Sequence, residues 1–355
     1  MNVWHMDVNH SQIFNLQKIH SELPTRRIIK KESSGKHFHY VLCLSEVKGM
    51  DLIMKKLFGT VIPIITPLTE NDSIDVESVK RLTDHCIENG MQCLYPCGTT
   101  GEMMYLTVEE RKLVAETVVK QAAGRVPVFV HVGAWNLKDT IELAQHAVSI
   151  GADGIGVITP VFYQLSDRGI ADYYIAVAKS VPEDFPIYLY GIKQNAINDL
   201  TKDTCEMVVK ECKNVVGAKY SFPDMTRLQQ LMTVNDGNFS VLVGPDHLFE
   251  AVVAVGGDGV ISGNAMCIPE HYSAIWKALQ AEDYKLATKL QRRTNILNAT
   301  MCEINNIAAY KVILKAEGVI ATTKMRRPME NLTEEQEKTL FEKMKELNYR
   351  TVEAI

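Results

Sequence analysis

The 355-residue chain lacks several features that define common classes of protein. No apolar run approaches the roughly 20 residues that a bilayer-spanning helix needs, which argues against a membrane protein. Lys and Arg number 38 against 43 Asp and Glu, and no basic tract stands out beyond RRIIKK at 26–31, so the net charge of −5 disfavours a nucleic-acid partner. The hydrophobic content of 46% is that of a globular protein with a large core, which we expect in the cytoplasm.

Zinc-type cysteine pairs are also missing. The eight cysteines are scattered, and Cys93 and Cys97 have no second pair to complete a tetrahedral site. We therefore expect free, mostly buried thiols in a reducing compartment. No His, Asp and Glu set with ligand spacing occurs at the predicted strand ends, which disfavours a metal-dependent barrel aldolase.

Residues 1–53 differ from the rest of the chain. They hold five of the ten histidines and show neither a sustained hydrophobic period nor the apolar core of a signal peptide. We expect a disordered or loosely attached extension, or an artefact of the assumed translation start. Met54 would then be a natural start for the folded part.

From residue 57 onward, short apolar runs alternate with amphipathic stretches. Near-continuous Val, Ile and Leu runs are typical of parallel strands that helices cover on both faces. There are eight such runs, each ending in glycine, proline or a small polar residue: 59–67, 92–98, 127–133, 153–160, 185–191, 214–221, 239–244 and 258–263.

The intervening segments are predicted to be helices. Apolar residues recur at three- and four-residue steps in 75–90, and 107–124 begins with a capping box formed by Thr107 and Glu110. Eight strand–helix units favour a (β/α)8 TIM barrel at 54–265, with a doubly wound open sheet as the alternative. Residues 266–355 are predicted to form the eighth barrel helix and a C-terminal helical bundle.

Active sites of such barrels lie at the carboxyl ends of the strands, and Lys219 ends an otherwise apolar run there. Desolvation disfavours an ammonium, which leaves a usable fraction of free amine for attack on a ketone. Tyr190 ends the preceding run, where its hydroxyl is placed to transfer protons. Taken singly, the lysine could also extend to solvent and the tyrosine could be a packed rim residue.

The loop GTTGE at 98–102 follows the second run. The hydroxyls of Thr99 and Thr100 and the backbone N–H groups beside them suit a carboxylate. A helix-capping turn is the alternative, but Thr107 and Glu110 already supply the cap of the following helix. We therefore expect the two threonines to be free for a ligand.

These motifs, with GAK at 217–219 and GGDGVIS at 256–262, resemble the dihydrodipicolinate synthase/N-acetylneuraminate lyase family. The resemblance covers the chain from about residue 57 to the C-terminal helices. It implies a metal-free, cofactor-free class I enzyme that forms a Schiff base with pyruvate or another 2-keto acid.

The resemblance also assigns roles to single residues. Lys219 would form the imine and Tyr190 would transfer protons. Thr99 and Thr100 would hold the carboxylate, with Thr100 also bonded to the tyrosine, and the Ile261 backbone would line the pyruvate site. Members of the family are commonly homotetramers, described as dimers of dimers.

Two departures from the family pattern concern the second substrate. Asn195 stands where synthases of the lysine pathway carry an arginine that binds an acidic aldehyde. Phe162 stands where they carry a second tyrosine, with Tyr163 one residue later, so Tyr163 or water would have to relay the proton. Both departures count against a dihydrodipicolinate synthase.

Polar residues near the last three strand ends suggest a site for a hydroxylated substrate. Sialic-acid lyases use G-x-D-E after strand seven, and this chain keeps the glycine and aspartate but has histidine for the glutamate. Hydrogen bonds to hydroxyls or simple loop satisfaction both fit these side chains. The candidates are Ser221, Gly244, Asp246, His247, Ser262 and Asn264.

The leading hypothesis is a Schiff-base lyase or aldolase that joins or releases pyruvate and an aldehyde. Its substrate would be a 2-keto-3-deoxy sugar acid or an N-acetylneuraminate-like compound. The alternatives are dihydrodipicolinate synthase, a 2-keto-3-deoxy acid dehydratase that uses the same imine, and a non-catalytic sensor of keto acids or sugar acids. The pairing of Lys219 with Tyr190 disfavours the sensor, because binding alone needs no desolvated amine beside a phenol.

Overall fold

The computed structural model describes residues 3–7, 29–34, 37–43, 54–303 and 305–355, which belong to two compact units, Met1–Ile53 and Met54–Ile355. The first unit contains an antiparallel sheet of order β1-β3-β2, built from β1 (Val3–Asp7), β2 (Ile29–Ser34) and β3 (His37–Cys43). The sequence predicted no regular element in these three segments, and the structure differs there. The remainder of 1–53 lies outside the described residues, and its loose attachment stays a prediction.

The second unit is the predicted (β/α)8 barrel. Each of the eight apolar runs contains one parallel strand: β4 (Gly59–Ile62), β5 (Cys93–Leu94), β6 (Phe129–His131), β7 (Gly154–Ile158), β8 (Ile187–Gly191), β9 (Val215–Tyr220), β10 (Ser240–Val243) and β11 (Gly259–Ile261). β5 is shorter than its apolar run because Pro96 cannot donate to a ladder and Cys97 has a φ of 63°.

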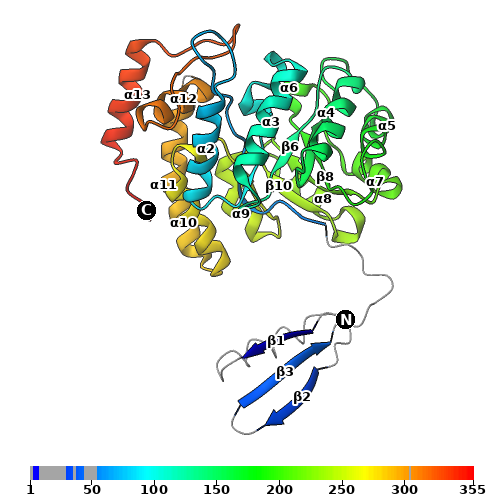
Figure 1. The fold of residues 1–355 in the computed structure, drawn as a ribbon. Coiled ribbons are helices and arrows are strands. Elements are labelled where there is room, and N and C mark those ends of the chain that lie inside the picture. The colour runs from blue at the N-terminus through cyan, green and yellow to red at the C-terminus, as the bar shows by residue number, and fades with distance from the viewer. Residues whose placement is uncertain (1–2, 8–28, 35–36, 44–53, 304) are drawn as a thin grey trace. The chain divides into compact units, whose positions relative to one another are not determined.

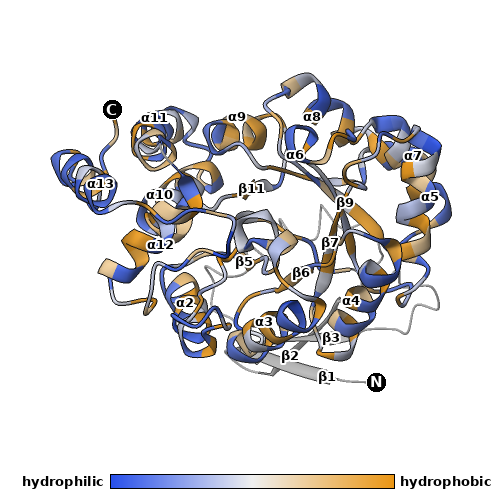
Figure 2. Cartoon of the chain, turned by 90° about the horizontal axis from the view of Figure 1, so that it is seen from above, coloured by the Kyte–Doolittle hydropathy of each residue, from blue (hydrophilic) through white to orange (hydrophobic). Residues whose placement is uncertain are grey.

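The strands close on themselves. Their order is β5-β4-β11-β10-β9-β8-β7-β6, and a parallel bridge between Leu94 and Val128 joins the two end strands. Seen from above in Figure 2, the helices surround the strands. The doubly wound alternative is therefore wrong, because such a sheet keeps two open edges.

Helices follow the strands and cover the outside of the barrel (Figures 1 and 2). They are α2 (Val76–Glu88), α3 (Val108–Ala122), α4 (Leu137–Ser149), α5 (Asp167–Ala178), the single-turn α6 (Lys193–Ala196), α7 (Lys202–Glu211), α8 (Met225–Met232), α9 (Phe249–Ala254) and α10 (Pro269–Gln280). The capping box is confirmed: Glu110 N–H donates to Thr107 Oγ1 (3.1 Å) and Thr107 N–H donates to Glu110 Oε2 (2.9 Å).

The C-terminal bundle is also confirmed. It consists of α11 (Tyr284–Cys302), α12 (Asn306–Ala316) and α13 (Glu334–Glu346). In Figure 1 these helices lie beside α2 and α10. Just beyond α12, the Val319 carbonyl accepts a hydrogen bond from Arg81 Nε of α2 (3.0 Å), which attaches the bundle to the first barrel helix.

Side chains along the strands alternate between two cores. In β8, Ile187 and Leu189 face the helices, whereas Tyr188 packs inside the barrel, edge-on to Phe129 with ring centroids 5.5 Å apart. The interior cluster at this level is largely apolar and consists of Leu57, Val61, Cys93, Tyr95, Phe129, Tyr188, Val216, Leu242 and Ile261. It closes the barrel from within, so the space left for a ligand lies toward the carboxyl ends of the strands.

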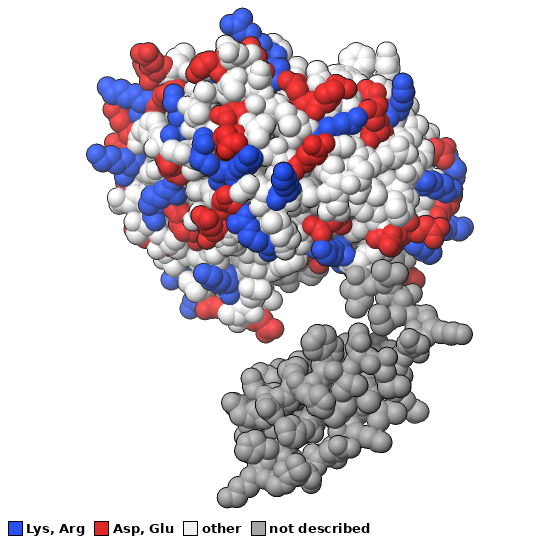
Figure 3. Space-filling model, in the orientation of Figure 1, with Lys and Arg blue, Asp and Glu red and all other residues white. Residues whose placement is uncertain are grey.

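Charges of both signs are mixed on the surface. On the face drawn in Figure 3, Lys and Arg side chains alternate with Asp and Glu. None of the helices in the described part of the chain combines the length and apolar character that a bilayer crossing requires.

The Tyr188 hydroxyl supports the interior, and its removal is a test of this packing. It accepts a hydrogen bond from Leu57 N–H (2.9 Å) and donates to Ser240 Oγ (2.9 Å). Tyr188→Phe leaves both buried partners unpaired, so we expect a loss of about 1–3 kcal/mol in the free energy of unfolding. Urea denaturation should show a lower midpoint at an unchanged slope. Tyr163→Phe, at a residue 73% exposed, is the matched control and should change the free energy by no more than about 0.5 kcal/mol.

Candidate active site

A β-bulge between β8 and β9 turns Lys219 into the barrel. Val215 pairs with Ile187 and faces the helices, so simple alternation would point Lys219, four residues later, toward the helices as well. The register shifts between Ile187 and Tyr188, and beyond it Tyr190 pairs with Lys219. One extra residue in β9 therefore brings the lysine beside the tyrosine on the inner face.

Lys219 is enclosed by aromatic rings. Its side chain is buried, and its Nζ lies 4.2 Å from the ring centroid of Tyr190 and 5.5 Å from that of Tyr95. The described ion pairs include none with a carboxylate at this lysine. The aromatic faces attract a cation weakly and exclude water from the amine.

The Tyr190 hydroxyl faces the threonine loop, and here one expectation is wrong. Tyr190 Oη lies 3.2 Å from the hydroxyl oxygen of Thr99, so Thr99 rather than Thr100 makes the hydrogen bond to the tyrosine. Thr99 begins a short 3₁₀ turn, η1 (Thr99–Gly101), and Thr100 lies one position further around it. Lys219, Tyr190 and Thr99 thus form one connected group at the ends of β9, β8 and β5.

Two polar residues beside the lysine were missed by the sequence analysis. Tyr95 directly follows β5 and His131 ends β6; both are buried, and their ring centroids lie 5.9 Å apart. Tyr95 Oη and His131 Nε2 have no hydrogen-bond partner in the described structure. A Cβ at Gly156 would lie 1.7 Å from Tyr95 Oη, so only glycine on β7 leaves room for this hydroxyl. Their apolar surroundings in the sequence gave no sign of this pairing.

His131 is held in its neutral form. Burial, together with the nearby cations of Arg111 and Lys219, keeps the pKa of His131 well below its usual range. The Arg111 guanidinium donates to the carbonyl oxygens of Gly133 and His131, each at 2.8 Å. Burial also raises the pKa of the Tyr95 phenol well above its usual value. Both groups are therefore neutral at physiological pH.

The polar residues at the ends of β9, β10 and β11 form a second group. Asp246 is engaged by the protein itself: Tyr272 Oη donates to Oδ1 (2.7 Å) and Asn264 Nδ2 donates to Oδ2 (3.0 Å). Burial raises the pKa of the Asp246 carboxyl, against the opposing effect of hydrogen bonds from Ser262, Tyr272 and Asn264. Asp246 thus orders this group of side chains, and its expected hydrogen bonds to substrate hydroxyls stay a prediction.

The remaining candidates differ in exposure. Ser221 is buried against Gly244, where an added Cβ would lie 1.9 Å from Ser221 Oγ. Ile261 and Ser262 are buried, Thr100 and Gly244 are partly exposed, and Asn195, His247 and Tyr163 are exposed at the rim. Phe162, at the position of the family's second tyrosine, is 69% exposed with a φ of 75°.

A cavity of about 330 Å³ lies at the carboxyl ends of the strands. It joins the threonine loop to Asn195 and to the C-terminal helices. Its walls are mainly apolar: Thr99, Glu102, Met103, Met104, Tyr105, Ile158, Val161, Asn195, Ile307 and Met329. A space of this size takes a small organic molecule. Thr99 and Asn195 line it, whereas Lys219 and Tyr190 do not.

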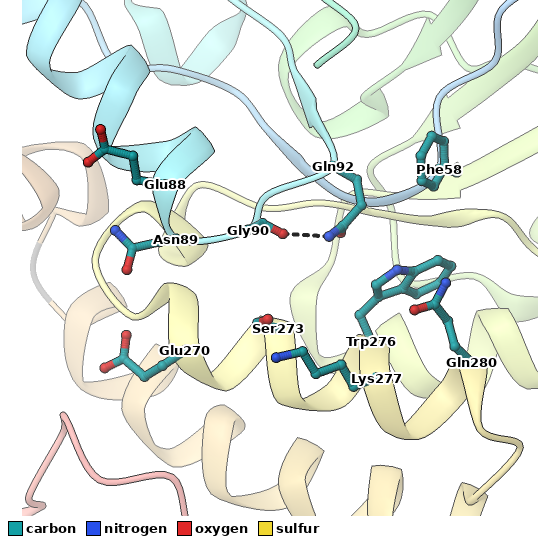
Figure 4. A pocket seen from close by; sticks show the side chains of 10 residues that line it. All are labelled: Phe58, Glu88, Asn89, Gly90, Gln92, Glu270, Ser273, Trp276, Lys277 and Gln280. Carbon is teal, nitrogen blue, oxygen red and sulfur yellow. Dashed lines mark hydrogen bonds between the residues drawn. The ribbon is translucent and has the colours of Figure 1, made fainter. Parts of the chain in front are cut away.

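A larger hollow of about 640 Å³ lies at the other end of the barrel (Figure 4). Its walls include Phe58 and Gln92, which directly precede β4 and β5, and residues of α10 such as Lys277. Gln92 Nε2 donates to the Gly90 carbonyl there (2.5 Å). None of the predicted site residues lines this hollow, so we assign the chemistry to the opposite end.

The cysteines and potential metal ligands add no second centre in the described part of the chain. Six of the seven described free cysteines are buried, as predicted, and Cys302 is exposed. Burial raises the pKa of Cys93 to about 12 and that of Cys97 to about 11, so both remain thiols. Among the described residues, no three His, Cys, Asp or Glu side chains are grouped closely enough to hold a metal ion.

Comparisons with known proteins agree with this geometry. Residues 56–347 match the model of the dihydrodipicolinate synthetase family. A 4-hydroxy-tetrahydrodipicolinate synthase of Aquifex aeolicus is 31% identical over 290 residues, which is 82% of this chain and 97% of the relative. An N-acetylneuraminate lyase of Mediterraneibacter gnavus is 31% identical over 285 residues, or 79% and 90% of the two chains.

A solved structure gives a direct parallel. The structure described as a catalytic lysine mutant of the Ruminococcus gnavus sialic acid aldolase superposes with a TM-score of 0.78 at 30% identity. The alignment covers 82% of this chain and 95% of that one. The resemblance inferred from the strand-end motifs is thereby confirmed.

The neutral state of His131 predicts a pH-dependent stability. The unfolded state binds a proton at this histidine near pH 6.5 and the native state does so only at lower pH, so stability falls as pH drops below about 6.5. Relative to His131→Gln, the unaltered protein should lose up to about 1.4 kcal/mol per pH unit in its free energy of unfolding. Urea denaturation at about pH 7.5 and about pH 5.5 measures this difference. His247→Gln on the exposed rim is the control, and an equal pH response in unaltered and His131→Gln proteins would contradict the assignment.

Proposed function

This chain belongs to the dihydrodipicolinate synthetase family, and we propose that it is a class I lyase or aldolase whose Lys219 forms an imine with pyruvate. The observation that carries the proposal is the buried Lys219 Nζ, 4.2 Å from the ring centroid of Tyr190, whose hydroxyl is hydrogen-bonded to Thr99. A nucleophilic amine, a phenol and a carboxylate-binding turn are the groups that Schiff-base chemistry on a 2-keto acid requires.

Imine formation would use the amine of Lys219, the phenol of Tyr190 and the carboxylate-binding turn. The neutral Lys219 amine attacks the ketone carbon, and loss of water leaves a protonated imine. The Tyr190 hydroxyl donates and accepts the protons of this step, with its direction set by the hydrogen bond to Thr99. The substrate carboxylate binds at the turn of Thr99 and Thr100, which places the ketone carbon toward the lysine.

Carbon–carbon cleavage then follows from the imine. The hydroxyl at C4 loses its proton and becomes the aldehyde, while the electrons of the C3–C4 bond move into the imine and give an enamine. Protonation of the enamine at C3 and hydrolysis by one water molecule release pyruvate and restore the Lys219 amine. The imine serves as the electron sink throughout, so the proposed reaction requires neither a metal nor an organic cofactor.

For the substrate, we favour a 2-keto-3-deoxy sugar acid or an N-acetylneuraminate-like compound. Asn195 lines the cavity of about 330 Å³ at the carboxyl ends of the strands, and it offers no positive charge to an acidic aldehyde. The similarity to a sialic acid aldolase and to an N-acetylneuraminate lyase supports the same class. Ser221 and His247 are the side chains that would donate hydrogen bonds to substrate hydroxyls, with Asp246 ordering their neighbours.

A 4-hydroxy-tetrahydrodipicolinate synthase is the second candidate. Its support is the similarity to the 4-hydroxy-tetrahydrodipicolinate synthase of Aquifex aeolicus. A dehydratase acting through the same imine would differ only in expelling a hydroxyl from the substrate rather than cleaving a carbon–carbon bond. We also propose a homotetrameric assembly, in keeping with the exposed aromatic rings of Phe162 and Tyr163, which contact each other at 5.0 Å between centroids.

Chemical trapping tests the proposed imine. Incubation with pyruvate and borohydride should reduce the imine to a stable secondary amine at Lys219, located by mass spectrometry of peptides. Lys219→Ala should abolish the adduct. Tyr190→Phe should slow its formation by about 10²–10⁴-fold, because proton transfer is lost while the amine remains. An adduct that persists in Lys219→Ala would exclude the mechanism.

A substrate panel separates the two candidate reactions. We expect turnover of a keto-deoxy sugar acid or N-acetylneuraminate, and little condensation of pyruvate with aspartate semialdehyde. Asn195→Arg should raise the aspartate semialdehyde rate by about tenfold or more, because a guanidinium pairs with a carboxylate in bidentate fashion. Asn195→Gln is the control for side-chain size. Rapid condensation with aspartate semialdehyde by the unaltered protein would favour the synthase instead.

A further inference from the structure

Glu102 ends the threonine loop in a conformation that needs support. Its φ of 61° and ψ of 31° place a non-glycine residue in the left-handed region, and its side chain is only 1% exposed. It connects the Thr99–Gly101 turn to the next 3₁₀ turn, η2 (Met103–Tyr105). Backbone strain and a buried carboxylate are both unfavourable, so other contacts must hold this residue in place.

Those contacts come from the C-terminal bundle. Lys311 of α12 is fully buried, and its Nζ donates to Glu102 Oε1 (2.5 Å) and to the Lys324 carbonyl (2.6 Å). Arg326 N–H donates to Glu102 Oε2 (2.7 Å). Both carboxylate oxygens of Glu102 are thus bound by residues more than 200 positions later in the chain.

The same region of α12 contacts the other side of the loop. A Cβ at Gly263, on the segment after β11, would lie 2.8 Å from Tyr310 Cε2 and 3.3 Å from Thr100 Cγ2. Tyr310 and Thr100 therefore meet across this glycine. Ile307, one turn before Tyr310 on α12, lines the cavity at the carboxyl ends of the strands together with Thr99. α12 accordingly borders the loop at Thr99, Thr100 and Glu102.

The barrel contacts the turn through Tyr190, whose hydroxyl lies 3.2 Å from Thr99 Oγ1, and through a residue that follows β4. Thr66 Oγ1, beyond β4, donates to the Gly101 carbonyl (2.8 Å). Within the turn, the Gly101 and Glu102 N–H groups donate to the Gly98 and Thr99 carbonyls at 3.0 and 3.1 Å. These bonds define the turn, and Glu102 ends it in the left-handed conformation that leads into η2.

We infer that the buried Glu102–Lys311 ion pair is a positioning element of the active site, which holds the Thr99–Gly101 turn in the geometry that binds the substrate carboxylate. The inference rests on the proposed function and extends it to residues that touch no reacting atom. It makes α12 part of the catalytic unit: the eight-stranded barrel supplies the lysine and the tyrosine, and the C-terminal helices set the carboxylate-binding loop.

The competing explanation is that the ion pair only stabilises the fold. In that case, breaking the pair would lower the stability of the protein and leave the ratio of its affinities for different carbonyl compounds unchanged. A positioning pair must affect carbonyl compounds that carry a carboxylate and spare those that do not. Pyruvate and hydroxyacetone form such a matched pair, because hydroxyacetone has a hydroxymethyl group in place of the carboxylate.

The experiment measures borohydride trapping at Lys219 against the concentration of each compound. In Glu102→Gln, the half-saturating concentration of pyruvate should rise about tenfold, as expected for a misplaced binding turn, while that of hydroxyacetone stays unchanged. The double variant Glu102→Gln/Lys311→Met should give the same split. It leaves no buried charge unpaired, so it avoids the destabilisation that follows loss of one partner alone.

Glu110→Gln is the matched control. Glu110 Oε1 accepts from Arg326 Nη2 at 2.6 Å, so this side-chain bond attaches the C-terminal segment to α3. The bond to Glu102 comes instead from the Arg326 backbone N–H, which Glu110→Gln leaves in place. This variant should lower the melting temperature and leave both half-saturating concentrations unchanged.

Each outcome of the trapping experiment decides a specific claim. Unchanged pyruvate trapping in Glu102→Gln, or an equal loss for pyruvate and hydroxyacetone in both Glu102 variants, would overturn the positioning role while the proposed function stands. Absence of a Lys219 adduct in the unaltered protein would overturn the proposed function and this inference with it.

Discussion

The active site depends on one irregularity in the pairing of β8 with β9. Successive side chains of a strand point to opposite faces. Because Val215 faces the helices, Lys219, four residues later, would face them too if the register of the pairing did not change. The bulge changes it, and Lys219 then pairs with Tyr190 on the inner face. Without that extra residue, the lysine would point into the apolar layer between strands and helices, where an unpaired ammonium is strongly disfavoured.

The sequence predicted the architecture because burial of a parallel sheet leaves a clear pattern. Each of the eight apolar runs contains a strand, and Lys219 and Tyr190, which were predicted as site residues from their places at strand ends, lie side by side. The bulge could not be predicted from the sequence, because Val215 and Val216 are equally apolar and nothing marks which of them faces the interior. Choosing between adjacent threonines failed for a similar reason: the hydroxyl that reaches Tyr190 is set by loop dihedrals, and those depend on distant contacts.

Polar groups inside the barrel distinguish the layer of the proposed active site from the packed interior. Below the lysine, the interior is filled by apolar residues and by rings such as Phe129 and Tyr188, whose hydroxyl is fully bonded. At the level of Lys219, Tyr95 Oη and His131 Nε2 are buried without partners in the described structure. Unpaired buried polar atoms are rare in folded proteins because each one costs free energy. These two atoms lie beside a buried amine, which agrees with the ligand site proposed for this layer.

The same reasoning explains why the chain continues beyond the barrel. A loop of two threonines between glycines has little to fix its side chains, and the adjacent strand β5 is only two residues long. A rigid carboxylate site at this position therefore needs support from outside the βα unit that contains it. The buried ion pair of Lys311 with Glu102 and the hydrogen bond from the Arg326 N–H supply that support. In the proposed function, carboxylate recognition would thus depend both on the second βα unit and on the last part of the chain.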